Sequence, residues 1–229
     1  MIRLENVVRT YVRHGQTVTA LHCKHLKIEM GEYVAVIGPS GSGKTTLLSL
    51  LGGMLSPTAG QIYLDDCSLY EQSVAVRSAI RLSRMGFVFQ TFNLIPYLTA
   101  LQNVQVPLSL KGDARDVQDS VATSMLCRFG LGDRLNHKPS ELSVGQQQRV
   151  ALARTLVNGP QIILADEPTG NLDPASREVV LKAFDDCHSE GRTILMVTHD
   201  LAAAAHAGRR LVLREGSISE QSDVISEAA

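Results

Sequence analysis

The chain of 229 residues contains no tryptophan, and aromatic residues make up only 4% of it. Its cysteines, Cys23, Cys67, Cys127 and Cys187, lie far apart and form neither a CxxC pair nor a zinc-ligand spacing, so we expect free thiols. No apolar run approaches the roughly 18 residues that cross a bilayer. The first residues also lack the basic and then apolar pattern of a signal peptide. We therefore expect any membrane role to depend on a partner chain.

The chain also lacks an excess of charge of either sign. Its formal net charge is −1 at pH 7, which leaves no basic excess to neutralise nucleic-acid phosphates, so we predict that nucleic acid is not a partner. A hydrophobic share of 44% and a charged share of 20% are typical of a soluble globular protein. The length suits one domain with a substantial core, or a domain with an inserted subdomain.

Residue patterns predict strands and helices along the chain. Residues 2–28 alternate and are rich in β-branched types, which predicts antiparallel strands joined by a turn at His14 and Gly15. The strand EYVAVIG precedes a helix, KTTLLSLLGGM, and the strands QIYLDD and MGFVFQ flank a helix near residues 74–83. Further on, the strands QIILAD, TILMVTH and RRLVLRE alternate with the helix PASREVVLKAFDDCHSEG, which predicts parallel βαβ units.

Between residues 91 and 158 the apolar spacing is helical, and no convincing strand occurs. We predict an α/β fold in a single domain, residues 1–229. Its core, residues 1–90 and 159–229, has a mostly parallel sheet and an N-terminal antiparallel β subdomain, and an α-helical subdomain is inserted at about 91–158. The tail after Ser217 is polar and acidic, so we expect it to be loosely held.

The segment GPSGSGKTT matches the phosphate-loop pattern GxxxxGK[ST] between a strand and a helix, which indicates a P-loop NTPase core. Its glycines allow a tight turn whose amides point at phosphate oxygens, and the following helix adds its positive end. Lys44 can reach the β- and γ-phosphates, and the Thr45 hydroxyl can bind Mg²⁺. We expect a nucleoside triphosphate site made by Gly38, Pro39, Ser40, Gly41, Ser42, Gly43, Lys44, Thr45 and Thr46.

Polar side chains follow three of the apolar strands. Asp166 and Glu167 end the strand IILADE, His199 follows TILMVT, and Gln90 ends MGFVFQ. The carboxyl ends of strands in an α/β sheet meet at the edge where ligands bind. There Asp166 suits a Mg²⁺ ligand acting through water, and Glu167 can align or deprotonate an attacking water. His199 can organise Glu167 and donate to the γ-phosphate, with a structural role as the alternative.

The segment LSVGQQQRVALAR, residues 142–154, predicts a second helix with an anion-binding start. Ser143 and Gln146, three residues later, form a capping box. The exposed N-terminus of such a helix binds anions.

Together these residues resemble the nucleotide-binding subunit of an ATP-binding cassette (ABC) transporter over nearly the whole chain. LSVGQQQR is similar to the signature motif, IILADEP to the Walker B strand, NLD to the D-loop, Gln90 to the Q-loop and His199 to the switch histidine. The resemblance implies ATP and Mg²⁺ as ligands, with the metal held by Thr45, Gln90 and, through water, Asp166. Tyr11 matches the aromatic residue that stacks on adenine; a packed strand tyrosine is the alternative.

The resemblance also implies a homodimer in which two copies bind head to tail around two ATP molecules. Ser143, Gly145, Gln146 and Asp173 would then complete the site of the partner copy. Where the family usually has glycine, this chain has Val144. A β-branched residue at positive φ would be strained, so we expect ordinary backbone angles at Val144, with Ser143 and Gly145 facing phosphate.

The segment QTFNLIPYLTALQNVQVPL is similar to the lipoprotein-releasing, macrolide-exporting and cell-division ATPases of bacteria. It implies an integral membrane permease on a separate chain and a cytoplasmic location, peripheral on the inner membrane. We expect docking through the helical subdomain, by exposed apolar residues that include Phe92, Leu94, Ile95 and Tyr97. The main alternative is a cell-division ATPase that activates a cell-wall hydrolase without transport. A soluble ABC ATPase with no transport role is a further alternative.

Overall fold

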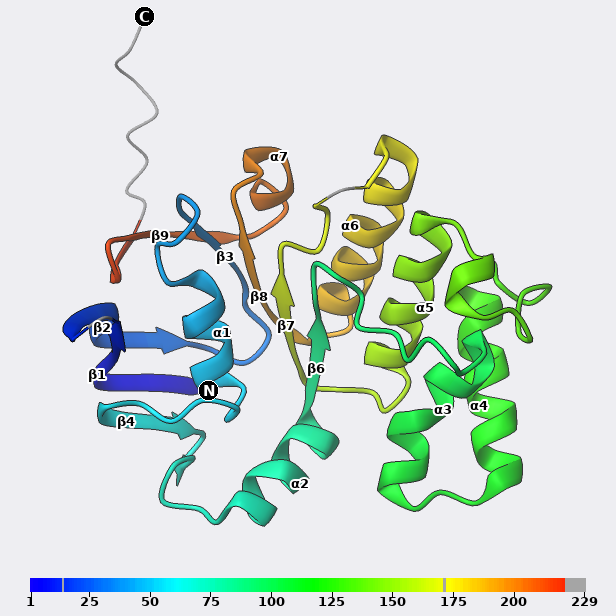
Figure 1. Cartoon of the computed structure of the whole chain (residues 1–229), viewed down its shortest axis with the longest axis horizontal. Coiled ribbons are helices and arrows are strands. Elements are labelled where there is room, and N and C mark those ends of the chain that lie inside the picture. Colours follow the sequence, from blue (N-terminus) through cyan, green and yellow to red (C-terminus); the bar gives the residue numbers. More distant parts are fainter. Residues whose placement is uncertain (14, 171, 221–229) are drawn as a thin grey trace, which may run out of the picture.

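The computed structural model describes residues 1–13, 15–170 and 172–220, and Figure 1 shows how its elements are arranged. The strands are β1 (Ile2–Arg13), β2 (Gln16–Ile28), β3 (Tyr33–Ile37), β4 (Ala59–Leu64), β5 (Cys67–Ser68), β6 (Met85–Val88), β7 (Ile162–Asp166), β8 (Thr193–Thr198), β9 (Arg209–Arg214) and β10 (Ser217–Glu220). The helices are α1 (Lys44–Leu51), α2 (Val74–Arg84), α3 (Ala100–Lys111), α4 (Arg115–Arg128), the 3-10 turn η1 (Pro139–Glu141), α5 (Val144–Leu156), α6 (Pro174–Ser189) and α7 (Leu201–Ala204).

One mixed sheet joins these strands in the order β5-β4-β1-β2-β10-β9-β3-β8-β7-β6. β1 and β2 pair antiparallel from Ile2 opposite Ile28 to Arg13 opposite Gln16, and β4 and β5 extend this antiparallel side. The strands β9, β3, β8, β7 and β6 run parallel to one another. The predicted α/β fold, with an antiparallel N-terminal part and a parallel core, is confirmed.

The parallel strands β3, β7 and β8 are buried on both faces, as their continuous apolar sequences predict. Along β7, Ile163 and Ala165 belong to the core on the side of α3 to α7, whereas Ile162 and Leu164 belong to the core on the side of α1. Successive side chains of a strand alternate between faces. The same alternation therefore places Asp166, the last residue of β7, on the side of α1, which follows the phosphate loop.

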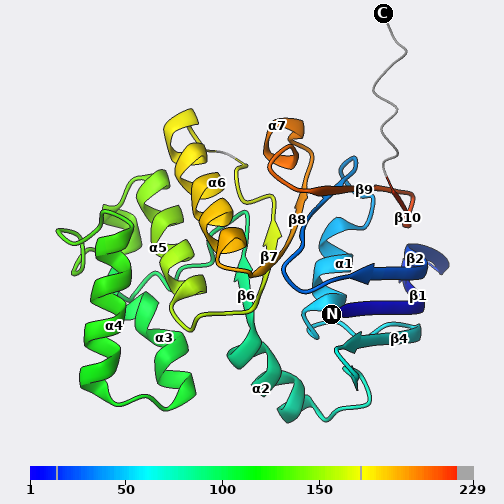
Figure 2. The same ribbon diagram turned by 180° about the vertical axis from the view of Figure 1, so that it is seen from behind.

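Helices α3, α4 and α5 pack together beside the β6 edge of the sheet in both ribbon views (Figures 1 and 2). α5 contacts β6, and α3 and α4 contact α5. Residues 91–158 are all described and contain these helices and η1 without a strand. This content agrees with an inserted helical segment, although its limits as a separate subdomain stay a prediction.

Two expectations about exposed segments are wrong. The first part of the expected loose tail, Ser217–Glu220, forms β10, which pairs antiparallel with β9. Residues 221–229 of that tail lie outside the described residues. Backbone hydrogen bonds hold this strand in spite of its polar side chains. Phe92 and Leu94 are partly buried against the helical core, and only Ile95 and Tyr97 of the four apolar residues are exposed. The side chains of Phe92 and Leu94 lie close enough to the core to pack against it.

Candidate functional site

The phosphate loop joins β3 to α1, and the backbone around it requires glycine at two positions. Gly43 caps α1 with a φ of 108°, and a Cβ at this position would overlap the carbonyl oxygen of Ala20. A Cβ at Gly38 would overlap the carbonyl oxygen of Leu213 in β9. No side chain caps α1. Its first amides therefore remain available to bind an anion.

Lys44 places a cation at the centre of this loop. The residue is only 8% exposed, and its ammonium donates to the carbonyl oxygens of Gly38 at 2.7 Å and Pro39 at 3.0 Å. The same Nζ lies 3.7 Å from Oε1 of Glu167. A buried cation needs such partners because it has lost most of its water. The contact brings the phosphate loop and the end of β7 into one site.

Thr45 and Asp166 form a second link between the loop and β7. The Thr45 hydroxyl donates to Oδ2 of Asp166 at 2.9 Å. Burial raises the pKa of Asp166, and the hydrogen bond from Thr45 opposes this shift. A hydroxyl beside a carboxylate provides the oxygen ligands that Mg²⁺ prefers, and protein-bound Mg²⁺ takes its other ligands from water and nucleotide phosphates. Within the described residues, no three His, Cys, Asp or Glu side chains are grouped so that they could hold a metal ion. A Mg²⁺ ion that takes most of its ligands from water and phosphates does not need such a group.

Glu167 is held by three groups at the end of β8. Its Oε2 accepts hydrogen bonds from the Thr198 hydroxyl at 3.2 Å, the His199 backbone N–H at 3.2 Å and Nδ1 of the His199 ring at 2.9 Å. Glu167 has a φ of 46°, in the left-handed region that few residues other than glycine adopt. Its side chain is 12% exposed, whereas that of His199 is 70% exposed. The carboxylate is therefore shielded and oriented by an accessible imidazole.

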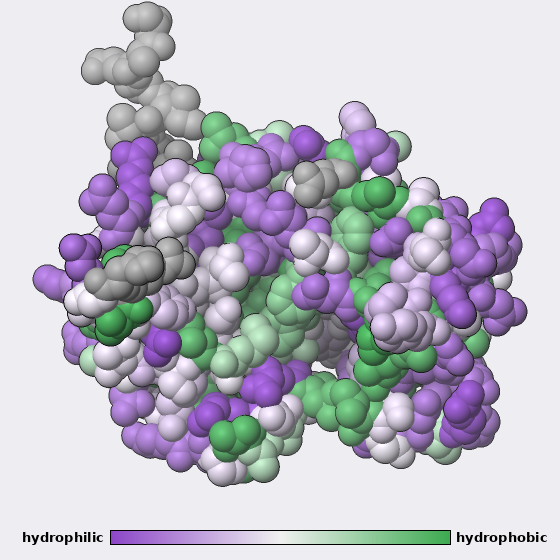
Figure 3. All heavy atoms as spheres, in the orientation of Figure 1, coloured by the Kyte–Doolittle hydropathy of each residue, from purple (hydrophilic) through white to green (hydrophobic). Residues whose placement is uncertain are grey.

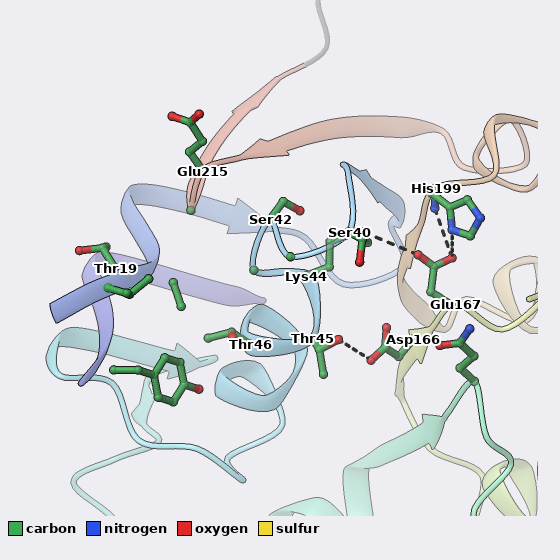
Figure 4. A pocket seen from close by; sticks show the side chains of 17 residues that line it. Thr19, Ser40, Ser42, Lys44, Thr45, Thr46, Asp166, Glu167, His199 and Glu215 are labelled. Atoms are coloured by element: carbon green, nitrogen blue, oxygen red, sulfur yellow. Dashed lines mark hydrogen bonds and ion pairs between the residues drawn. The ribbon is translucent and has the colours of Figure 1, made fainter. Parts of the chain in front are cut away.

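These groups line one cavity of ≈ 920 Å³ (Figure 4). Figure 4 shows Glu167 and His199 facing each other and Thr45 paired with Asp166. The predicted residues on its wall are Tyr11, Ser40, Gly41, Ser42, Gly43, Lys44, Thr45, Thr46, Gln90, Asp166, Glu167 and His199. Gly38 and Pro39 reach the site through their contacts with Lys44. The volume suits a small-molecule ligand.

Tyr11 lies in this wall, and a second side chain supports its ring. The Arg9 guanidinium carbon lies 4.6 Å from the ring centroid, a cation–π geometry. Arg9 also donates to the Ser56 carbonyl oxygen at 2.9 Å. The two residues are two positions apart on β1, and the cation–π contact brings their side chains together across an irregularity in the β1–β2 register at Arg9 and Thr10. The ring is therefore held in place at the edge of the cavity.

Several lining residues were missed by the sequence reasoning. Val18, Thr19 and Ala20 lie on β2, where Val18 pairs opposite Tyr11. The hairpin register was the signal that could have found them. Glu215 and Gly216 form the turn between β9 and β10, and the Gly216 amide donates to the Ser42 carbonyl oxygen at 3.1 Å. An acidic residue followed by glycine after an apolar strand is a turn pattern, but nothing in it indicates that the turn would reach the phosphate loop.

The second helix start, at α5, has the predicted capping box. The Ser143 hydroxyl accepts from the Gln146 amide at 3.2 Å, and Oε1 of Gln146 accepts from the Ser143 amide at 2.9 Å. Val144 is the first residue of α5 and does not have a positive φ, as expected. Gly145 is buried, and a Cβ there would overlap Oγ of Ser176 in α6. Glycine at 145 therefore allows α5 and α6 of one chain to approach closely.

The segment NLD lies between β7 and α6, and its Asn171 is outside the described residues. Asp173 caps α6, accepting from the Ser176 amide at 3.0 Å and from the Ser176 hydroxyl at 2.6 Å. These bonds hold the pKa of Asp173 below its usual value. The cavity of this chain is not lined by Ser143, Gly145, Gln146 or Asp173. Their predicted place in a partner's site stays a prediction.

The comparisons with known proteins agree with this geometry. Residues 21–170 match the family model described as ABC transporter. The chain belongs to the ABC transporter family. It is 42% identical, over 98% of its length and 99% of the relative's, to an uncharacterized ABC transporter ATP-binding protein, YvrO, of Bacillus subtilis. It is 44% identical over 97% of its length to a macrolide export ATP-binding/permease protein, MacB 2, of Aeromonas hydrophila, of which it covers 34%.

Among solved structures, this ABC chain is similar to the ATP-binding cassette MJ0796 in a dimeric, post-hydrolysis state bound to ADP and phosphate. The two are 39% identical with a TM-score of 0.91, over 99% of this chain and 100% of the other. The family and these likenesses identify the chain as an ATP-binding and ATP-hydrolysing cassette. It spans about a third of the length of the macrolide-export relatives. Within the described residues, no helix is both long enough and apolar enough to cross a membrane.

Proposed function

We propose that this cassette binds Mg²⁺–ATP, dimerises head to tail on ATP and drives an integral membrane permease on a separate chain. The observation that carries the proposal is the position of Glu167. Its carboxylate contacts Lys44 of the phosphate loop through one oxygen and His199, which follows β8, through the other. Such a carboxylate can orient or deprotonate a water that attacks the γ-phosphate.

Each residue of the cavity has a distinct task in this proposal. The backbone N–H groups of residue 38 and residues 40–46 and the Lys44 ammonium bind the phosphates, while Tyr11 stacks on adenine. Thr45, Gln90 and, through water, Asp166 hold Mg²⁺, which when bound neutralises charge that develops on the phosphate oxygens. His199 keeps the Glu167 carboxylate in one orientation through Nδ1.

Completion of the site by a second copy is supported by two observations. The start of α5 offers the amides of Val144 and Gly145 beyond those used in its own cap. The similar cassette MJ0796 is described as dimeric in both of its solved structures. In the proposed dimer, Ser143, Gly145, Gln146 and Asp173 contact the nucleotide held by the other copy.

A groove of ≈ 330 Å³ supports the permease proposal. It lies between α2, β6 and the helices α3 and α5, and its apolar walls include Leu82, Phe87, Phe89 and Pro107. Figure 3 shows apolar side chains around a hollow in this part of the surface, between the regions of α2 and α3. The macrolide-export relatives are named as combined ATP-binding and permease proteins. We propose that an apolar segment of the permease occupies the groove, which would hold this chain at the cytoplasmic face of the inner membrane.

The names of these relatives favour an exporter, or a related mechanotransmission system, over activation of a cell-wall hydrolase. Identification of the membrane protein that copurifies with the chain separates the two. A permease whose deletion causes intracellular accumulation of an exported compound supports transport. A partner whose loss instead abolishes cell-wall hydrolase activity contradicts it.

A mixing experiment tests the proposed dimer. Lys44→Ala removes phosphate binding and Ser143→Arg places bulk at the start of α5, so each variant should be inactive alone. A mixed dimer has one site with both defects and one with neither, and hydrolysis should partly recover. Continued inactivity despite a demonstrated heterodimer would mean that the signature helix acts within its own chain, or that both sites must work together.

A further inference from the structure

Arg154, in the last turn of α5, makes a fork of two hydrogen bonds to consecutive carbonyl oxygens. Its Nη1 donates to the Asn93 oxygen at 2.6 Å, and its Nη2 donates to the Phe92 oxygen at 2.7 Å. Within the described residues, Arg154 has no carboxylate partner. Burial lowers the pKa of the guanidinium, so these two carbonyl dipoles are its main compensation.

The two carbonyls belong to a strained turn. Phe92 has a φ of 60° and Asn93 a φ of 50°, and two successive non-glycine residues in the left-handed region persist only where their surroundings hold them. Backbone bonds from Phe92 to Phe89 at 3.1 Å and from Asn93 to Thr91 at 2.6 Å form the turn itself. Arg154 adds the contact to a different element of the fold.

This turn begins directly after Gln90, which lines the ATP cavity. The Arg154 side chain also lines the apolar groove, together with Asn93, Phe87 and Phe89. Arg154 therefore lines the groove and also holds the backbone of the turn that follows Gln90. It does so from α5, the helix that Ser143 caps.

We propose that Arg154 is a positioning residue that sets the place of Gln90 in the ATP site by clamping the turn at Phe92 and Asn93. This proposal rests on the proposed function for the role of Gln90 toward Mg²⁺. Failure of the clamp and failure of the proposed function give different experimental results.

The chain offers a matched control in Arg149. This residue lies on the same helix, is likewise half-buried, and donates through Nη1 to the Phe129 carbonyl oxygen at 3.1 Å. Its partner follows α4 and is remote in sequence from Gln90. Arg149→Met and Arg154→Met therefore remove the same functional group from the same helix. Only the second should change the metal-dependent step.

The experiment measures ATP hydrolysis by the isolated cassette as Mg²⁺ is varied, with ATP affinity in EDTA and the thermal melt as companions. Arg154→Met should raise the half-maximal Mg²⁺ concentration and lower kcat by about 10- to 100-fold, the scale of a misplaced active-site group. ATP affinity in EDTA should stay within about twofold. Arg149→Met should leave the half-maximal Mg²⁺ concentration and the ATP affinity in EDTA at wild-type values. Its kcat is not compared, because Arg149 ends the segment LSVGQQQR. Arg154→Lys should recover little, since an ammonium cannot reproduce the planar fork.

A double-mutant cycle with Gln90→Ala decides whether Arg154 acts through Gln90. If it does, Arg154→Met should lower kcat little further in a chain that already carries Gln90→Ala. Three results would each overturn the proposal: losses of kcat that multiply in the double mutant, an equal rise of the half-maximal Mg²⁺ concentration in Arg149→Met, or wild-type metal dependence in Gln90→Ala. If Arg154→Met does not melt cooperatively, Arg154→Lys is used in the same cycle with the same criteria. A wild-type cassette that hydrolyses no ATP would instead refute the proposed function.

Discussion

Helices α1 and α5 both begin at a glycine-bearing segment, and their starts are built in opposite ways. α1 is preceded by Gly43 at a φ of 108°, without a side-chain cap. α5 is preceded by Ser143 in an extended conformation, with a complete capping box to Gln146. The glycines also differ: backbone geometry requires Gly43, whereas contact with the Ser176 side chain requires Gly145.

The difference follows from what surrounds each start. At α1, Lys44, Asp166 and Glu167 are all supplied by the same chain, and free amides can turn directly to an anion. At α5, the capping box satisfies part of the helix end within this chain alone. In the dimer proposed above, α5 would therefore keep its own cap where it shares a ligand with the partner copy, whereas α1 has free amides for the ligand of its own chain.

The first prediction separates chemistry at the α1 side from binding there. Glu167→Gln should lower kcat by roughly 10²- to 10⁴-fold, because it removes the group proposed to accept a proton from water. ATP should still bind, since the phosphate loop is unchanged. Steady-state phosphate release and equilibrium titration with labelled ATP measure the two. Lys44→Ala is the contrasting variant and should lose binding itself; a Glu167→Gln cassette with wild-type turnover would show that another residue handles the water.

The second prediction tests why α5 needs glycine. Gly145→Ala should push α5 away from Ser176 of α6, at about 1–3 kcal/mol per chain for overpacking, so ATP-driven dimerisation should weaken strongly. Ser176→Gly in the same chain should restore it, because the overlapping hydroxyl is gone. Val144→Gly is the control and should change dimerisation little, since Val144 is 51% exposed. Dimers are measured by sedimentation with ATP in the Glu167→Gln background. No rescue by Ser176→Gly would mean that the added methyl group disturbs the proposed contact with the partner's nucleotide and not the contact with α6.

The third prediction concerns the adenine side of the α1 site. Tyr11→Ala should weaken ATP binding about 5- to 150-fold, from the 1–3 kcal/mol that a base–aromatic stack contributes. Tyr11→Phe should be near neutral. Titrations with ATP and with inorganic tripolyphosphate measure this, and only ATP should be affected. Equal losses in both variants would assign the effect to the hydroxyl and leave Tyr11 as a packed strand residue.

The smallest expected effect lies away from both helix starts. Hydrogen bonds from the N-terminal ammonium and from Arg84 hold the pKa of Asp65 below its usual value. A lowered carboxyl pKa stabilises the fold above the unfolded pKa of about 3.9, and this stability is lost as pH falls through the lower folded value. Asp65→Asn should cost at most about 1 kcal/mol at pH 7, because the side chain is 45% exposed and water weakens its ion pairs. Urea unfolding at pH 7 and pH 3 checks this; an equal cost at both values would exclude the charge as its source.

Local pattern was enough for much of the fold and site. The phosphate loop was predictable because a tight anion-binding turn needs glycine, lysine and a hydroxyl residue at fixed spacing. Asp166, Glu167 and His199 were predictable because parallel strands end at one edge. The cap at Ser143 was predictable because it depends on residues three apart.

Long-range packing decided the rest. The carbonyl oxygen of Ala20 in β2 excludes a side chain at Gly43, and that of Leu213 in β9 excludes one at Gly38. Both strands are distant in sequence from the phosphate loop. The burial of Phe92 and Leu94, the pairing of β10 and the contact of Gly145 with Ser176 have the same origin. Neighbouring residues in the sequence determine turns, caps and strand ends because those need only local hydrogen bonds. Which side chain must be absent at a contact is determined by two elements that meet only when the chain has folded.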